Sequence, residues 1–317
     1  MRFLYLQDFH LTGKTPCNRM DNFYQSLLLK LDEVLLLAKK NKVDFIIDGG
    51  DFFNSELVAN TIVDDALDKI EKTKINWYML FGNHPMVGHS IENSKATSLQ
   101  HMFNRSKYVE HLTTLTLTAS KQKGIIDYLQ GFEYKHNIEQ DIKEKGLYCK
   151  EPNASFKIAV VHALITQKPL MDKIMHIPIK DVKTDFNVVF VAHNHLSWGI
   201  LEQNGVKFVN IGCLGRTGVD EVDIIPTIVL IDSETHQIDL IPLKSAKKGD
   251  EVFDLEKVAI NKQFEGEIDN FIKSLDSTKL QSLNIRGLIE FLAKENKIEE
   301  EVKNCVIKRV GDYENEL

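Results

Sequence analysis

The stretch FNVVFVAHNH (186–195) places two histidines, His193 and His195, directly after a run of apolar residues. The β-branched and aromatic run predicts a buried strand that ends at these histidines. A single histidine more commonly lies on the surface or in a satisfied core hydrogen bond, and we expect that of most of the 11 histidines in the chain. Whether this pair forms a site therefore depends on the partners that other segments supply.

Five further runs have the same form and mostly end in Gly, Asn, Asp or His. They are RFLYLQ (2–7), VDFIID (43–48), INWYMLF (75–81), FKIAVV (156–161) and VKFVNI (206–211). Each predicts a buried strand. Apolar residues at helical spacing fill the gaps at 22–40 and 58–73. Strands and helices that alternate in this way indicate a layered α/β domain.

The second half of the chain adds two predicted hairpins and a change of composition. The stretches 112–132 and 227–243 have the pattern of hairpins and predict antiparallel strands that join the domain. After about residue 250 the sequence is charged, helical in pattern and nearly free of strand signal. We therefore assign 1–249 to the main domain and 250–317 to a small helical appendage that caps the domain or binds a partner.

The composition is that of a globular chain with a substantial core, since 43% of the 317 residues are hydrophobic. No apolar run reaches the ~20 residues of a membrane span, and the N-terminal run is too short for a signal peptide, so we expect a cytoplasmic protein without a membrane partner. The four cysteines have no CxxC spacing, which argues against a zinc knuckle or a disulfide framework. The formal net charge of -7 argues against a nucleic-acid ligand, although two bound divalent cations would reverse the local sign.

Residue types that bind metal ions follow five of the predicted strands. They are Asp8 and His10 in DFH, Asp51 in GGD, Asn83 and His84 in GNH, His162, and His193 with His195. Because sites in α/β sheets form at the carboxyl ends of strands, we expect these side chains to meet at one rim. Oxygen and imidazole donors without a thiolate suit manganese, iron or zinc, and a carboxylate such as Asp51 can bridge two cations. Each motif alone commonly marks a turn, but five in this order predict a two-metal site.

These segments resemble the signature segments of the calcineurin-like metallophosphoesterases. Within that superfamily the strongest resemblance is to the Mre11/SbcD-type nucleases, because of DFHL (8–11), GGDFF (49–53) and NIGCLGRTGVDE (210–221). The resemblance covers about residues 1–245. It implies an α/β fold in which a layered β-sandwich is flanked by helices, and two divalent metal ions. Mn²⁺ is the expected metal, with Mg²⁺, Fe²⁺ or Zn²⁺ as alternatives.

The resemblance also implies a role for each matching position. One metal would be held by Asp8, His10, Asp51 and His195, and the other by Asp51, Asn83, His162 and His193. A hydroxide that bridges the two metals would attack phosphorus, while His84 stabilises the transition state or protonates the leaving oxygen.

Two positions depart from the family pattern. Pro85 stands where many relatives have an acidic residue that orients the histidine, so the support for His84 must come from elsewhere. Asn54 stands where the nuclease branch commonly has a histidine that holds the nucleotide. As a candidate substrate-binding residue, asparagine can hydrogen-bond phosphate but carries no charge. Arg216 could also contact phosphate, although a surface location is more common for a lone arginine.

The leading hypothesis is a two-metal DNA exonuclease or endonuclease that acts as the Mre11/SbcD-like subunit of a DNA repair or recombination complex. DNA and an SbcC/Rad50-like ATPase subunit would be its partners, and a homodimer is also open. Two alternatives remain. One is a phosphodiesterase or phosphatase that acts on nucleotides or phosphoprotein, which the acidic charge favours. The other is a non-catalytic metal-binding scaffold, which Pro85 and Asn54 suggest.

Overall fold

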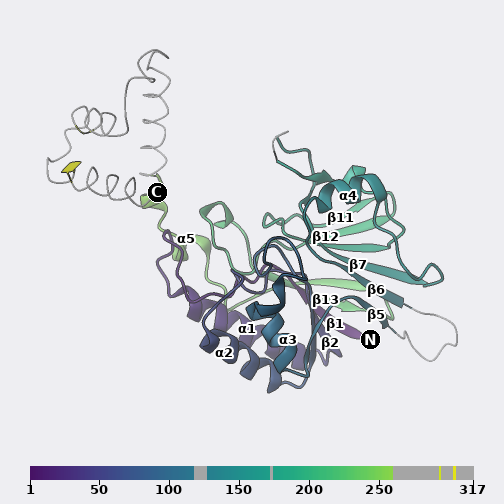
Figure 1. Cartoon of the computed structure of the whole chain (residues 1–317), viewed down its shortest axis with the longest axis horizontal. Coiled ribbons are helices and arrows are strands. Elements are labelled where there is room, and N and C mark those ends of the chain that lie inside the picture. Colours follow the sequence, from purple (N-terminus) through teal and green to yellow (C-terminus); the bar gives the residue numbers. More distant parts are fainter. Residues whose placement is uncertain (118–126, 172–173, 260–292, 294–302, 305–317) are drawn as a thin grey trace, which may run out of the picture. The chain divides into compact units, whose positions relative to one another are not determined.

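Two six-stranded sheets packed face to face form the body of the protein in the computed structural model (Figure 1). The structure describes residues 1–117, 127–171, 174–259, 293 and 303–304. The chain divides into two compact units, Met1–Leu255 and Glu256–Leu317. The appendage predicted at 250–317 lies largely outside the described residues, so its role as a cap or a partner-binding segment stays a prediction.

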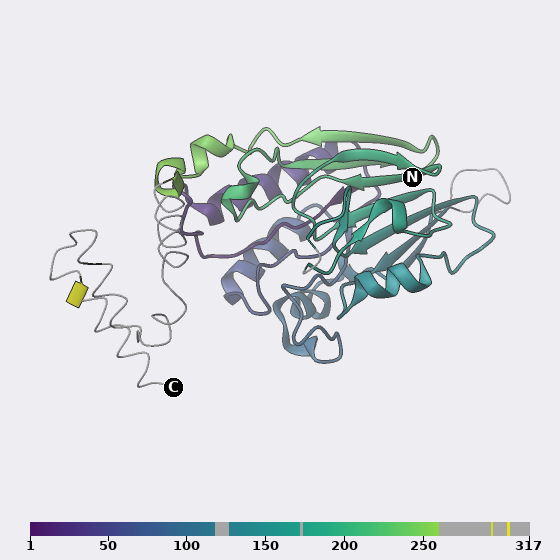
Figure 2. The same ribbon diagram turned by 90° about the horizontal axis from the view of Figure 1, so that it is seen from above.

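The first sheet contains the N-terminal strands and the last hairpin. Its strands are β1 (Arg2–Leu6), β2 (Phe45–Asp48), β3 (Asn76–Met79), β4 (Val109–His111), β13 (Thr227–Asp232) and β14 (Gln237–Pro242), in the order β14-β13-β1-β2-β3-β4. The strands β1 to β4 run parallel. The strand β13 pairs antiparallel with both β1 and β14, so the hairpin lies beside the N-terminal strand (Figure 2). The three strands and the hairpin predicted in these regions are confirmed.

The second sheet is built from the middle of the chain. Its strands are β5 (Thr114–Leu117), β6 (Asp127–Phe132), β7 (Phe156–His162), β10 (Val188–Ala192), β11 (Gly199–Gln203) and β12 (Val206–Asn210), in the order β11-β12-β10-β7-β6-β5. The strands β6, β7, β10 and β12 run parallel, while β5 and β11 pair antiparallel with their neighbours. The short strands β8 (Ile165–Thr166) and β9 (Ile177–Pro178) pair with each other. The strands predicted at 156–161, 186–192 and 206–211 are confirmed, as is the antiparallel pair predicted at 112–132.

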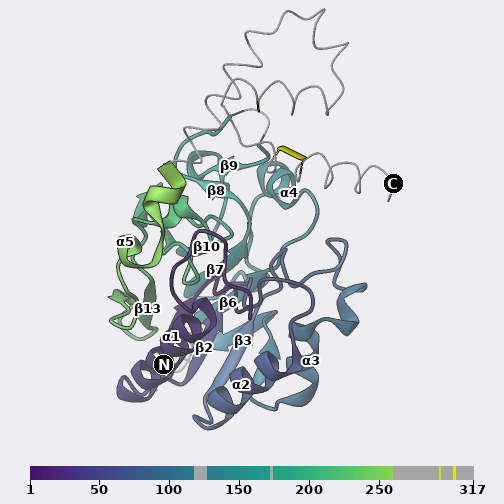
Figure 3. The same cartoon turned by 90° about the vertical axis from the view of Figure 1, so that its left-hand side faces the viewer.

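Helices cover the outer face of each sheet. The helices α1 (Phe23–Lys40), α2 (Asn60–Glu71) and α3 (Ser98–Arg105) lie together beside β2 and β3, and α4 (Ile138–Lys145) lies near β8 and β9 (Figure 3). The first helix begins where the side chain of Asn22 accepts a hydrogen bond from the main-chain nitrogen of Gln25. A short helix, α5 (Gly249–Val252), follows the last hairpin. Among the described helices, none is long and apolar enough to cross a membrane.

Residues of β1 show why the central strands are apolar throughout. Phe3 and Tyr5 pack in the core between the two sheets, whereas Leu4 and Leu6 pack in the core under the helices of the first sheet. A third core fills the space between the second sheet and α4. Both faces of these strands are buried, so their sequences lack the polar alternation of a half-exposed strand. The fold is the layered α/β sandwich that the sequence predicts.

The five site segments reach one shared edge from two different sheets. Asp8, Asp51 and Asn83 follow strands of the first sheet, and His162 and His193 end or follow strands of the second. The main-chain nitrogen of His193 donates to a carboxylate oxygen of Asp8 at 3.1 Å, which ties the two sheets together there. The rim predicted from the sequence is therefore a seam between the sheets rather than the edge of a single open sheet.

Candidate metal centre

Four of the predicted metal ligands have a left-handed backbone within four residues of the end of a strand. The φ angle is 48° for Asp8, 53° for His10, 56° for Asp51 and 76° for His193. Residues with a Cβ rarely adopt this conformation, which costs roughly 1–3 kcal/mol at each position. Strain gathered on four residues of one cluster is typical of a functional site.

Two glycines make room for Asp51 in different ways. Gly50 has a φ of 111°, so the chain turns sharply just before Asp51. Gly82 does not have a positive φ, but a Cβ there would collide with the carboxylate of Asp51. The glycine of GNH is thus needed for close packing against Asp51 rather than for an unusual turn.

Asp8, His10 and His195 form the first group of candidate ligands. Their ligand atoms all lie within 4.8 Å of one another. The Nε2 atoms of His10 and His195 are 3.0 Å apart and face each other. Asp8 and His10 are buried, with exposed fractions of 0% and 1%. The structure therefore brings together the residues predicted for one metal, apart from the bridging carboxylate.

Asp51, His162 and His193 form the second group, again with ligand atoms within 4.8 Å of one another. The Nε2 atom of His162 lies 3.4 Å from Oδ2 of Asp51 and 3.2 Å from Oδ1 of Asn83. Asp51 also belongs to a group with His10 and His84. The carboxylate of Asp51 is thus central to the cluster, which is the position expected of a bridging ligand.

The donor atoms of this cluster fit divalent cations. Oδ2 of Asp51 and Nδ1 of His10 are buried, and neither has a hydrogen-bond partner among the described residues. A buried carboxylate oxygen without a partner is costly unless a cation or a hydrogen bond compensates it. The Nε2 atoms of His10 and His195, 3.0 Å apart, also lie close enough to bind one cation together. The residues present therefore fit the two divalent metals expected at this site.

The pKa values of His10 and His193 favour metal binding, whereas carboxylates and other neighbours raise those of His162 and His195. Burial lowers the pKa of His10 and of His193 to about 3, so both imidazoles are neutral near pH 7, as metal ligation requires. Burial opposes the charge on Asp51, but His162 and His10 outweigh it and lower the pKa of that carboxyl. Burial likewise opposes the charge on His162, but Asp51 and then Asp8 raise its pKa to about 9. Asp51 therefore remains a carboxylate.

Three neighbours orient the candidate ligands through their second polar atoms. Glu221 accepts a hydrogen bond from Nδ1 of His195, Gln7 donates to Asp8 at 3.1 Å, and the carbonyl oxygen of Gly49 accepts from Nδ1 of His162 at 3.0 Å. Such contacts fix the tautomer and the direction of a metal ligand. The sequence pattern did not identify Gln7 or Glu221 as site residues. Glu221 does lie in NIGCLGRTGVDE (210–221), so the motif was the available signal.

His84 lies beside the cluster and is held by the main chain. Its Nδ1 atom donates to the carbonyl oxygen of Asn54 at 3.0 Å, and its main-chain nitrogen donates to Oδ1 of Asp51 at 2.9 Å. Its Nε2 atom lies 4.0 Å from Oδ2 of Asp51. The support that Pro85 cannot give comes from Asn54.

The two predicted substrate-binding residues have structural contacts of other kinds. The main chain of Asn54 holds His84, and a phosphate contact of its side chain stays a prediction. Arg216 is 2% exposed, so the surface location expected for it is wrong. Its guanidinium donates to the carbonyl oxygens of Ile224 and Lys247, at 3.3 and 2.6 Å. These bonds hold the segment before β13 against the loop before α5, and a contact of Arg216 with phosphate also stays a prediction.

A two-sheet sandwich that gathers two groups of carboxylate and imidazole donors at one edge defines a metal-dependent phosphoesterase. The family described as calcineurin-like phosphoesterase matches residues 1–197. The chain belongs to that family. No curated protein matches its sequence.

Several solved structures are similar to this chain. The protein TT1561 of Thermus thermophilus is 11% identical, with 76% of this chain and 98% of that chain covered and a TM-score of 0.44. The calcineurin-like phosphoesterase YfkN from Bacillus subtilis is 10% identical, with coverage of 76% and 90% and a TM-score of 0.42. A dimetal phosphatase from Danio rerio is 9% identical, with coverage of 76% and 98% and a TM-score of 0.46. What this chain hydrolyses has to be argued from its own residues.

Proposed function

We propose that this phosphoesterase is a DNA nuclease of the Mre11/SbcD type, with manganese as its metal. The supporting observation concerns segment 210–221, which carries the sequence resemblance to that branch. Within it, Glu221 accepts from His195, and the main-chain nitrogen of Leu214 donates to the carbonyl oxygen of Asp8 at 3.1 Å. The segment that distinguishes the nuclease branch in sequence therefore holds residues from two of the site motifs.

The side chains of the cluster have different roles in phosphodiester hydrolysis. When bound, two divalent cations activate water and neutralise charge on the phosphate. Asp8 and Asp51 supply the negative charge that holds cations at an edge where phosphate must approach. His84 acts on the leaving oxygen through Nε2. Because the Asn54 oxygen can only accept, Nδ1 carries a hydrogen, and this bond fixes the ring so that a protonated Nε2 can donate.

One observation favours a second candidate, a phosphodiesterase or phosphatase for nucleotides or phosphoprotein. The net charge of -7 gives the protein no general attraction for a long polyanion. The non-catalytic scaffold is the weaker alternative, because the hydrogen bond from His84 to Asn54 replaces the support that Pro85 cannot give.

The test is a substrate panel with manganese-loaded protein. It contains a single-stranded oligonucleotide, duplex DNA, a chromogenic phosphodiester and a phosphomonoester. We expect cleavage of at least one DNA substrate, with a large loss for His84→Gln and none for His101→Gln, which changes an exposed histidine on α3. Turnover of small esters without cleavage of DNA would favour the second candidate. Inactivity on every substrate would favour the scaffold.

We also propose that an SbcC/Rad50-like ATPase binds the region after the main domain. The proposal rests on the resemblance and on the charged, helical pattern of 250–317. Capture of a purified ATPase of this type by the full chain, but not by Met1–Leu255, would support it, whereas equal capture by both would exclude that region as the binding site.

A further inference from the structure

Three aromatic rings form a group that reaches the candidate metal centre through one of its members, Tyr134. His89 comes from the loop after β3, and Tyr134 and His136 come from the loop after β6. The ring centroids of His89 and Tyr134 are 5.3 Å apart, and those of His89 and His136 are 6.1 Å apart. His89 and His136 are exposed and Tyr134 is half-buried. From the sequence, these two histidines are expected to be ordinary surface or core residues.

Tyr134 connects this aromatic group to the second group of candidate ligands. Its ring centroid lies 5.7 Å from that of His193 and 6.2 Å from that of His162. Its main-chain nitrogen donates to the carbonyl oxygen of Phe81 at 3.0 Å, just before the GNH segment. The loop after β6 is thereby fixed to the loop that carries Asn83, His84 and His89, so the rings and the cluster keep their spacing.

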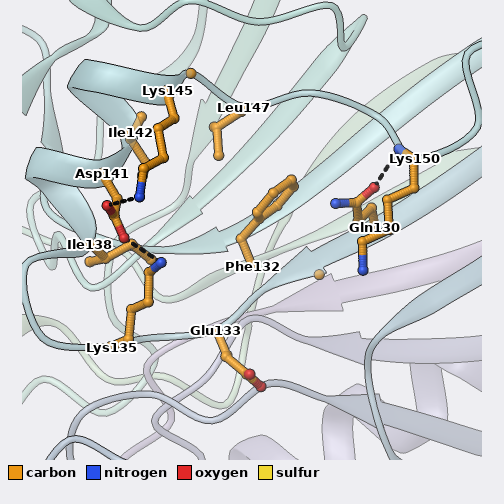
Figure 4. Close-up of a pocket in the computed structure, with 12 residues that line it drawn as sticks. Gln130, Phe132, Glu133, Lys135, Ile138, Asp141, Ile142, Lys145, Leu147 and Lys150 are labelled. Carbon is orange, nitrogen blue, oxygen red and sulfur yellow. Dashed lines mark hydrogen bonds and ion pairs between the residues drawn. The ribbon is translucent and has the colours of Figure 1, made fainter.

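The far side of the same loop is anchored separately. Lys135 and Lys145 both form ion pairs with Asp141 of α4, the second at 2.6 Å, in a cavity of about 300 Å³ (Figure 4). Glu133 and Lys135 line this cavity, but Tyr134 between them does not. The ring of Tyr134 instead faces the candidate metal centre, where it contacts the rings of His193 and His162.

We propose that His89, Tyr134 and His136 form a stacking surface for the nucleobase of the nucleotide at the scissile phosphate. This inference rests on the proposed DNA nuclease function and names how that site would hold its substrate. A base is joined to its phosphate through one sugar, so a phosphate at the cluster places its base within reach of the Tyr134 ring, which contacts His193. Aromatic side chains stack on every base, which suits a nuclease that acts without sequence preference.

The test compares oligonucleotides that carry a base or an abasic residue on either side of the scissile phosphate. Loss of one stacking interaction is expected to lower kcat/KM about tenfold. We expect the wild type to prefer the base-bearing substrate by about that factor on one side of the phosphate. Tyr134→Leu should remove this preference, so that base-bearing and abasic substrates are cleaved with the same kcat/KM. Tyr134→Phe should keep the preference, because its ring can still stack.

A matched control is Tyr108→Leu. Tyr108 is also half-buried, but it precedes β4 and so lies at the opposite end of the first sheet from the cluster. This variant should behave as the wild type does. If Tyr134→Phe loses as much of the preference for the base-bearing substrate as Tyr134→Leu does, the hydroxyl rather than the ring is responsible, and the stacking proposal is wrong. If Tyr134→Leu slows cleavage of the base-bearing and abasic substrates equally, the stacking proposal is also wrong, although the proposed nuclease function is unaffected. If the wild type hydrolyses only a phosphomonoester, both proposals fall.

Discussion

The carbonyl oxygen of Asn54 lies 3.0 Å from Nδ1 of His84 and is the acceptor that holds this ring beside the cluster. Position 54 and position 85 are the two departures from the family pattern, and the structure connects them. Asn54 supplies through its main chain the support that Pro85 cannot supply through a side chain. A main-chain acceptor is independent of the side chain at position 54, so Asn54→Ala should leave the orientation of His84 intact.

Replacement of His84 separates a role in catalysis from a role in metal binding. His84→Gln should keep two metals per chain and lower kcat about 10²-fold or more, as expected for the loss of a general acid. The measurement pairs elemental analysis with turnover of a chromogenic phosphodiester. Because His84 also forms a possible ligand group with His10 and Asp51, a parallel loss of metal and activity would make it a ligand instead.

Replacement of Asp51 should affect both metals at once. Its carboxylate lies in one group with His162 and His193 and in another with His10 and His84. In Asp51→Asn we expect the loss of metal at both positions, because the amide removes the negative charge that both cations share. Elemental analysis decides this, with the exposed Asp44→Asn as the control. Retention of two metals at wild-type affinity would show that Asp51 is not the bridge.

Glu221 should affect the binding affinity of only the metal that His195 holds. Its carboxylate accepts from Nδ1 of His195 and is 3% exposed. Loss of such an orienting contact typically costs 10–100-fold in metal affinity. We expect Glu221→Ala to weaken one of two binding steps by roughly this factor in a titration of metal-free protein, and the exposed Asp220→Ala to leave both steps unchanged. Equal weakening of both steps would mean that the variant disturbs the whole cluster.

The sequence predicts the central strands and the identity of the cluster because both depend on local patterns. Runs such as FNVVFVA are apolar throughout since two cores bury their two faces, and the residue types after them are those of metal ligands. The assignment of strands to two sheets is not local, because the apolar pattern of β7 does not say whether it pairs with β1 or with β10. Short or weakly apolar elements, such as β4 and α4, gave no clear signal.

Long-range contacts of the site could not be predicted from local sequence patterns either. Glu221 orients a histidine 26 positions away, and the burial of Arg216 depends on the carbonyl groups of Ile224 and Lys247. Neither relationship follows from residue spacing. Both are found within or next to the motif at 210–221, which carried the family resemblance but did not show its contacts.

A buried lysine predicts a dependence of stability on pH. Burial, and then repulsion by Arg216 and Arg19, lower the pKa of Lys30 from 10.5 to about 7. Between these values the unfolded chain binds more protons than the folded one, so stability rises with pH across that window. The contribution of Lys30 is about 2 kcal/mol from pH 7 to pH 9.

The test of this contribution is urea unfolding at pH 7 and at pH 9. Lys30→Met has no group to titrate at this position. From pH 7 to pH 9 its free energy of unfolding should therefore rise by about 2 kcal/mol less than that of the wild type. Lys39→Met, at an exposed position of the same helix, should retain the wild-type change. If the free energy of unfolding of Lys30→Met changes between pH 7 and pH 9 as much as that of the wild type, Lys30 titrates at its ordinary pKa.

Two buried residues lie beyond the predicted domain boundary at 249 and contact the main domain. Val252 and Phe253 are each 1% exposed, and the ring of Phe253 lies 5.2 Å from the guanidinium of Arg19. The main-chain nitrogen of Met20 donates to the carbonyl oxygen of Val252 at 2.9 Å. A chain that ends at Lys248 loses these contacts, and removal of a buried phenylalanine alone typically costs about 3–5 kcal/mol. We expect this chain to unfold at a clearly lower urea concentration than a chain that ends at Leu255. Equal midpoints would place the boundary at 249, as the sequence pattern suggested.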